Sequence, residues 1–200
     1  MARLARLSLV VAAVALSGCG GGGKHAEQCP TKGKQVTFPL LDPAKTHTVH
    51  VQTNLGAFDI RLFVEGSPCT TSSFASLVRK RFFDGTRFHR IVPGFVIQGG
   101  DPTGTGGGGP GYTVVDKPSI YTAYIRGTVA MAKTAAQPAG TAGSQFFIVT
   151  GRMASLPSDY AVLGEISRGM DVVQRIGRLG NPVTEKPTRR VIVRRMTITP

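Results

Sequence analysis

Residues 84–101 read Asp84-Gly85-Thr86-Arg87-Phe88-His89-Arg90-Ile91-Val92-Pro93-Gly94-Phe95-Val96-Ile97-Gln98-Gly99-Gly100-Asp101. The inner part of this stretch, residues 88–97, is a short apolar run of the kind that forms buried strands. Runs of the same kind follow at 128–132, 145–150 and 160–166. The middle of the chain is therefore predicted to consist of several short strands.

The chain before this stretch predicts a β-hairpin. Residues 47–53 alternate, with Val49, Val51 and Thr53 on one face. Asn54-Leu55-Gly56 is a turn signal, and residues 57–63 alternate again. The side chains expected to point inward from this second strand are Phe58, Ile60 and Leu62.

Two helices and a last strand complete the predicted elements. Ser67-Pro68 is suited to the start of a helix, with Ser67 as the cap and Pro68 at the first helical position. That helix should end at residues 79–81, which are all basic and suit the negative end of the helix dipole. A second helix is predicted at 169–178 and a final strand at 189–198. Many short strands with two helices predict a mainly β fold, a closed barrel plugged at both ends.

Composition limits the class of protein. The chain has 200 residues, 41% of them hydrophobic, which suits one ordinary domain and excludes a wholly disordered chain. Of the 26 glycines, ten lie in two clusters at 20–23 and 104–111, and the glycines have no three-residue period, which excludes collagen. The stretch Gly104-Thr105-Gly106-Gly107-Gly108-Gly109 fits the dinucleotide-loop pattern, but Pro110 and β-branched residues follow it where a helix should begin.

The first 18 residues predict an export signal. Arg3 and Arg6 precede the mostly apolar stretch 7–16, which is too short to span a bilayer. Leu16-Ser17-Gly18-Cys19 resembles the lipobox of bacterial lipoproteins, which implies cleavage before Cys19 and acylation of its thiol. We therefore expect a protein anchored by lipid to the extracytoplasmic face of the cell membrane. Residues 19–46 would form a Gly-rich tether and stalk, and residues 47–200 the folded domain.

Two further cysteines, Cys29 and Cys69, fit the same location. In an oxidising compartment an even pair favours a disulfide, which would attach the stalk to the domain. The alternative is a reactive thiol, because Cys69 falls in the first turn of the first predicted helix, where a thiolate is stabilised. Titration of free thiols would distinguish the two.

Three sequence blocks together resemble the cyclophilins, a family of peptidyl-prolyl cis-trans isomerases. The first is residues 84–101; the second combines Gly127 to Ala132 with Gly143 to Ile148; the third runs from Leu156 to Ile166. They occur in the family's order, and the likeness covers about residues 47–199. The resemblance implies an eight-stranded antiparallel barrel capped by two helices, and an enzyme that rotates X-Pro peptide bonds without a cofactor.

The resemblance also implies site residues. Arg90 matches the catalytic arginine, Phe95 the ring beneath the proline, and Gln98 the amide that orients the arginine. Substrate-binding positions are matched by Val96, Ala132, Lys133, Gln145, Phe147, Leu156 and Tyr160. Three of these depart from the usual residues: Val96 replaces Met, Lys133 replaces Asn, and Tyr160 replaces His while keeping a group that can hydrogen-bond.

These residue types suit the chemistry of prolyl isomerisation. The barrier to rotation is about 18–20 kcal/mol of lost amide resonance, and no bond is made or broken. A catalyst therefore needs an apolar surface for the proline ring and a fixed donor for the prolyl nitrogen, whose lone pair returns only in the twisted amide. A guanidinium stays charged and offers several such donors.

Several classes remain as alternatives or are set aside. We expect an isomerase that assists the folding of exported proteins. A module that holds proline-containing segments without turnover would use the same pocket, and comparing Arg90→Ala with the wild type in proline-limited refolding would distinguish the two. The net charge of +13 is compatible with nucleic-acid binding, but the export signal and the absence of a recognition module argue against it. The four histidines show no metal-ligand spacing.

We expect the protein to be a monomer. Ser155 stands where cyclosporin-sensitive members carry Trp, so cyclosporin binding should be weakened.

Overall fold

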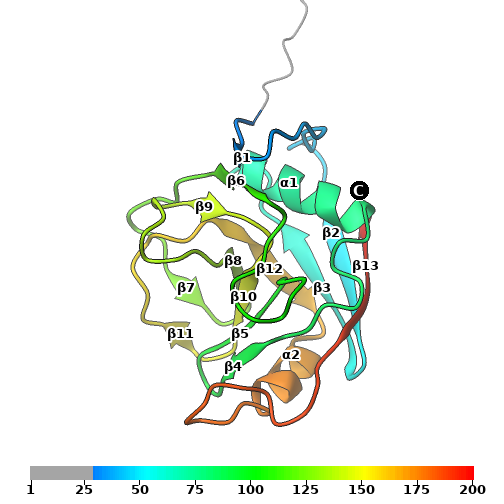
Figure 1. Ribbon diagram of the computed structural model, residues 1–200, viewed down its shortest axis with the longest axis vertical. Helices are drawn as coiled ribbons and strands as arrows, with labels where there is room; N and C mark the ends of the chain where they lie inside the picture. Colours follow the sequence, from blue (N-terminus) through cyan, green and yellow to red (C-terminus); the bar gives the residue numbers. More distant parts are fainter. Residues whose placement is uncertain (1–28) are drawn as a thin grey trace, which may run out of the picture.

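The computed structural model describes residues 29–200. The predicted signal peptide 1–18, the lipidation site Cys19 and the tether 20–23 lie outside these residues. The main sheet is antiparallel, and its strand order is β13 (Val193–Thr199), β2 (Thr48–Thr53), β3 (Gly56–Leu62), β12 (Val162–Arg168), β8 (Thr128–Met131), β10 (Phe146–Val149), β5 (Val96–Gly99) and β4 (Arg90–Val92). Figure 1 shows this sheet curling around the core.

The predicted hairpin is confirmed as β2 and β3. Val49 pairs with Ile60 and Val51 with Phe58 across the two strands, and all four side chains are buried. His50 and Gln52 point to the other face, where His50 pairs with Asp59 at 2.9 Å. The alternation of apolar and polar residues was sufficient to predict this hairpin, because one of its faces is buried and the other is not.

The sheet is an open, strongly curled half-barrel, so the predicted closed barrel is wrong. The edge strands β4 and β13 share no ladder. The loop before β13 covers the edge of β4 instead, where the N–H of Ile91 donates to the carbonyl of Glu185 at 2.8 Å. The two ends of the sheet approach each other just before these edge strands, where the N–H of Gly85 donates to the carbonyl of Val193 at 2.8 Å and the N–H of Val193 donates to the carbonyl of Thr86 at 2.8 Å. The edge of β4 is thus occupied by an irregular loop and has no donors left for strand pairing.

Both predicted helices are present, at opposite ends of the sheet (Figure 1). Helix α1 is Pro68–Arg79 and α2 is Met170–Gly177. The side chain of Ser67 makes no cap hydrogen bond, contrary to expectation. A carboxylate distant in sequence acts at this helix start, because the Thr70 N–H donates to Asp116 Oδ2 at 2.5 Å.

Two small sheets flank the main one. β1 (Lys32–Gly33), β6 (Tyr112–Val115) and β9 (Thr141–Ala142) form the first, and β11 (Met153–Ala154) and β7 (Tyr124–Ile125) the second. The favoured Cys29–Cys69 disulfide is present and joins the segment before β1 to the first turn of α1. Within residues 29–200, no helix has the length and apolar character needed to cross a membrane.

Candidate active site

The main sheet carries two apolar clusters, one on each face. On β10, Phe146 and Ile148 point into the large core, whereas Phe147 and Val149 belong to a second cluster on the outer face. The two pairs belong to different clusters because successive side chains along a strand point to opposite faces of the sheet. All four residues are buried because both faces are covered, which is why β10 reads in the sequence as a continuous apolar run.

Strand register brings the predicted catalytic arginine beside the outer cluster. Arg90 on β4 lies opposite Gln98 on β5, which lies opposite Phe147 on β10. Residues directly opposite in an antiparallel sheet point to the same face. The three side chains therefore form a row across three strands, although 57 positions separate the first from the last in the printed sequence.

The outer apolar cluster gathers most of the predicted substrate-binding residues. Its buried part contains Phe147, which is 4% exposed, and its partly buried rim consists of Phe95, Ala132, Leu156, Tyr160 and Val162. The other buried members are Val96, Tyr124, Ala130, Val149 and Ala154. Half-buried aliphatic and aromatic side chains around a buried ring form a surface on which a small apolar ring can pack.

A chain of hydrogen bonds runs from Arg90 along this surface. Arg90 Nε donates to Glu185 Oε2 at 2.6 Å, and Arg90 Nη1 donates to Gln98 Oε1 at 3.4 Å. Gln98 Nε2 then donates to Gln145 Oε1 at 3.1 Å. Gln145 Nε2 donates to the carbonyls of Gly106 and Gly108, both at 2.9 Å. The guanidinium is thus held on one side, and its remaining N–H groups are available to a substrate.

The glycine-rich loop at the end of this chain is shaped by the buried Asp101. One carboxylate oxygen accepts from the N–H and hydroxyl of Thr103, and the other from the N–H groups of Gly106 and Gly108. Burial alone would raise the pKa of Asp101, but these hydrogen bonds outweigh burial and hold its pKa well below the usual range. Gly106 has a φ of +92°, and a Cβ on Gly108 would lie 2.0 Å from Asp101 Oδ1. The loop therefore needs these glycines and leads into β6, not into a helix.

A groove of about 420 Å³ adjoins the amide pair of Gln98 and Gln145. The glycine-rich loop forms one wall, and Lys133, Thr134 and Gln137 form part of the other. Ala132 also lines it, so the predicted residues Ala132, Lys133 and Gln145 meet here. The polar groove and the outer apolar cluster share Ala132, so the two surfaces are continuous.

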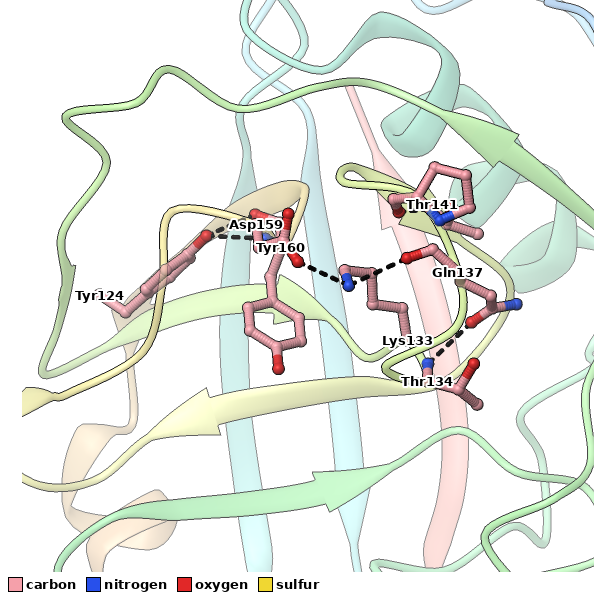
Figure 2. Close-up of polar contacts among 8 residues, drawn as sticks. Tyr124, Lys133, Thr134, Gln137, Thr141, Asp159 and Tyr160 are labelled. Carbon is pink, nitrogen blue, oxygen red and sulfur yellow. Dashed lines mark hydrogen bonds and ion pairs between the residues drawn. The ribbon is translucent and has the colours of Figure 1, made fainter.

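Lys133 lines the groove and also approaches Tyr160 of the apolar cluster. Figure 2 shows its ammonium group between Gln137 and Asp159. Its side chain is only 4% exposed, and Nζ lies 2.6 Å from Asp159 Oδ2 and 3.1 Å from the carbonyl of Gln137. The same nitrogen lies 5.4 Å from the centre of the Tyr160 ring. Here Lys133 therefore links the loop 133–137 to the loop that carries Tyr160.

Three aromatic rings form the wall of the outer cluster. Tyr124, Phe147 and Tyr160 meet edge to face, with centroids 5.4 to 6.2 Å apart. The Tyr124 hydroxyl donates to the carbonyl of Tyr160 and accepts from its N–H (Figure 2). Burial raises the pKa of Tyr124, so this hydroxyl stays protonated and fixes the Tyr160 backbone.

Nothing in the described part of the chain resembles a metal centre, since residues 29–200 contain no group of three or more His, Cys, Asp or Glu side chains that could hold one. His89, next to Arg90, is half-buried, and burial lowers its pKa below the usual histidine value. His89 is therefore neutral at pH 7 and adds no charge beside the guanidinium.

Comparison with known proteins agrees with this geometry. Residues 48–198 match the family described as Cyclophilin type peptidyl-prolyl cis-trans isomerase/CLD. The chain belongs to the cyclophilin family. The resemblance inferred from the three sequence blocks is thereby confirmed at the level of the family.

This cyclophilin has curated relatives in bacteria and plants. It is 35% identical over 173 residues to Peptidyl-prolyl cis-trans isomerase A of Mycobacterium tuberculosis, with 78% of this chain and 94% of that protein covered. It is 34% identical over 156 residues to Peptidyl-prolyl cis-trans isomerase CYP18-2 of Arabidopsis thaliana, with 75% and 92% covered.

Solved structures show the same fold. A cyclophilin type peptidyl-prolyl cis-trans isomerase of Cryptosporidium parvum superposes with a TM-score of 0.69 at 30% identity, covering 78% of this cyclophilin and 99% of that chain. The same protein in the presence of the dipeptide Ala-Pro gives a TM-score of 0.67 at 31% identity, covering 76% and 99%.

Sequence reasoning missed three residues of the site. Tyr124 has no periodic pattern around it, and its partner Tyr160 lies 36 positions later. Glu185 lies 95 positions from Arg90, and Asp159 acquires its role only through Lys133. No local signal could have identified these pairings, because each joins loops that only the folded chain brings together.

Proposed function

We propose that this cyclophilin catalyses cis-trans isomerisation of X-Pro peptide bonds. The observation that carries the proposal is the row formed by Arg90, Gln98 and Phe147, in which a held guanidinium borders an outer apolar cluster. The relatives named above are isomerases, and one similar structure was determined in the presence of Ala-Pro.

The mechanism follows from the strength of each contact in the planar and the twisted amide. The proline ring packs on the outer apolar cluster around Phe147, which holds one side of the bond. As the amide twists, its nitrogen regains a lone pair and accepts a hydrogen bond from the Arg90 guanidinium. This contact strengthens only in the transition state and therefore raises the rate. No proton is transferred, so a neutral His89 has no acid–base role.

Arg90→Ala tests the mechanism. We expect kcat/KM for a proline-containing peptide to fall about 100-fold or more, the usual loss when a donor to the transition state is removed. Arg195→Ala, an exposed arginine on β13, is the matched control and should retain wild-type activity. Equal rates of proline-limited refolding for Arg90→Ala and the wild type would favour the alternative, a module that binds proline segments without turnover.

We further propose that the protein is exported and lipid-anchored through Cys19, and acts as a monomer on unfolded exported proteins. The basic and apolar order of residues 1–18 and the small residues before Cys19 support this. The Cys29–Cys69 disulfide is consistent with an oxidising compartment. Mass measurement of the membrane fraction should find an acylated Cys19 as the first residue, and Cys19→Ser should move the protein to the soluble fraction.

We also propose that cyclosporin inhibits this cyclophilin weakly. Ser155, at the position where sensitive members carry Trp, is exposed and offers little apolar area to the drug. Titration of the isomerase should give a higher inhibition constant than for a Trp-bearing member, and Ser155→Trp should lower that constant.

A further inference from the structure

A segment outside the region that matches the cyclophilin family contributes to the groove. The family match begins at residue 48, whereas β1 comprises Lys32–Gly33. Lys32 pairs with Thr113 on β6, and the N–H of Lys34 donates to the carbonyl of Gly111 at 2.9 Å. The Cys29–Cys69 disulfide fixes this segment to α1 just before β1. The position of β1 beside the groove is thus held from both ends.

The side of the groove formed by β1 is positively charged. Lys32 and Lys133 are the charged residues that line the groove, and in the described chain no carboxylate does. The charge of Lys133 is compensated by Asp159 at 2.6 Å. Lys32 is exposed and takes part in none of the ion pairs found among residues 29–200.

Asp101, the carboxylate behind the glycine-rich wall, does not line the groove. Asp101 is fully buried, and its two oxygens already accept four hydrogen bonds from Thr103, Gly106 and Gly108. Among residues 29–200, Lys32 is therefore the charged lining residue of the groove that has no ion-pair partner.

We propose that Lys32 makes this cyclophilin select peptides with acidic side chains in the residues before the X-Pro bond. A peptide whose proline lies on the outer apolar cluster and continues past Gln98 and Gln145 runs into the groove. Ala132, Lys133 and Gln145 match the family positions that contact the residues before the proline. The inference rests on the proposed isomerase function and adds a substrate class to it.

The test compares three peptides that differ only in the three residues before Ala-Pro. These three residues are all Glu in the first peptide, all Gln in the second and all Lys in the third. At low ionic strength we expect wild-type kcat/KM to be about three- to fivefold higher for the Glu peptide than for the Lys peptide, the range of one exposed ion pair. Lys32→Glu should reverse this order, and Lys32→Gln should bring the ratio close to one. The preference of the wild type should shrink in 1 M salt.

Lys45→Glu is the matched control, since Lys45 is also exposed, lies in the same N-terminal segment and does not line the groove. If Lys45→Glu changes the ratio as much as Lys32→Glu, the preference comes from the overall basic charge and the proposal is wrong. The proposal is also wrong if the wild-type ratio is one. The Gln peptide reports the isomerase itself, so loss of the charge preference and failure of the proposed function are distinguishable.

Discussion

At the scale of single residues, the site depends on how Arg90 is held. Its Nε donates to Glu185 at 2.6 Å, and the carbonyl of the same Glu185 accepts from the Ile91 N–H. Glu185 itself has a φ of +56°, a backbone conformation that non-glycine residues adopt at a cost. We therefore expect Glu185 to be a positioning residue that acts by orienting the Arg90 guanidinium.

Glu185→Gln should reduce kcat/KM about three- to tenfold. The amide keeps an acceptor for Arg90 but loses the charge, and charge-assisted hydrogen bonds are roughly twice as strong as neutral ones. The loss should appear in kcat rather than in KM, because in the proposed mechanism the guanidinium acts on the twisted amide. Glu165→Gln, which removes the charge from the exposed Arg61–Glu165 pair, is the control and should leave both constants unchanged. A loss confined to KM would contradict the positioning role.

At the scale of elements, the glycine-rich loop depends on the ionised form of Asp101. Because its pKa is lowered in the folded state, Asp101 stabilises the fold fully above the ordinary aspartate pKa of about 3.9. That stabilisation is lost as the pH falls below this value toward the folded-state pKa. The stability of the loop should therefore follow the charge of this one carboxylate.

Asp101→Asn should lower the free energy of unfolding at pH 7 by about 2–4 kcal/mol, since hydrogen bonds to a buried charge are strong. The difference from the wild type should narrow as the pH falls from about 4 to 2. Denaturant titrations across this pH range would measure it. Asp171→Asn, at an exposed position on α2, should show a small difference. If the difference in free energy of unfolding between Asp101→Asn and the wild type stays constant down to pH 2, the charge of Asp101 does not stabilise the loop.

The Lys133–Asp159 ion pair joins the loop 133–137 to the loop that carries Tyr160. Lys133 is 4% exposed and Asp159 is 35% exposed, so removing the two partners should have unequal effects. Asp159→Asn leaves a buried ammonium without its counter-charge and should lower the free energy of unfolding by about 2–4 kcal/mol. Lys133→Met leaves the Asp159 carboxylate accessible to water and should lower the free energy of unfolding by about 1 kcal/mol or less. Equal losses in denaturant titrations would mean that Lys133 is not desolvated in solution.

At the scale of the whole molecule, the main sheet curls without closing, and α1 and α2 cover its ends. The irregular loop before β13 covers the β4 edge and brings Glu185 to Arg90. The segment from Cys29 to Lys34 attaches to this body through the disulfide and β1. Two irregular segments thus add to the open sheet: one places Glu185 beside the row of Arg90, Gln98 and Phe147, and the other places Lys32 beside the groove.

The Cys29→Ser/Cys69→Ser variant should lower the free energy of unfolding by about 3–4 kcal/mol, because the bridge closes a loop with a sequence separation of 40. The loss arises in the unfolded chain, which gains freedom without the cross-link. Denaturant titrations of the variant and the wild type would measure it. Equal midpoints for the two proteins would show that the bridge does not constrain the unfolded chain.

The sequence by itself determined the hairpin, both helices and the family, because alternation, proline position and the string around Arg90 are local features. The resemblance to the family also predicted Arg90, Gln98 and Phe147 as site residues. Only the tertiary structure decided that these three lie in one row, because strand register depends on pairing between distant segments. The tertiary structure likewise decided that the sheet stays open and that Lys32 lies beside the groove. It also decided that Glu185 contacts Arg90 and that Asp159 contacts Lys133. Contacts between loops produce no periodic pattern in the sequence from which they could be predicted.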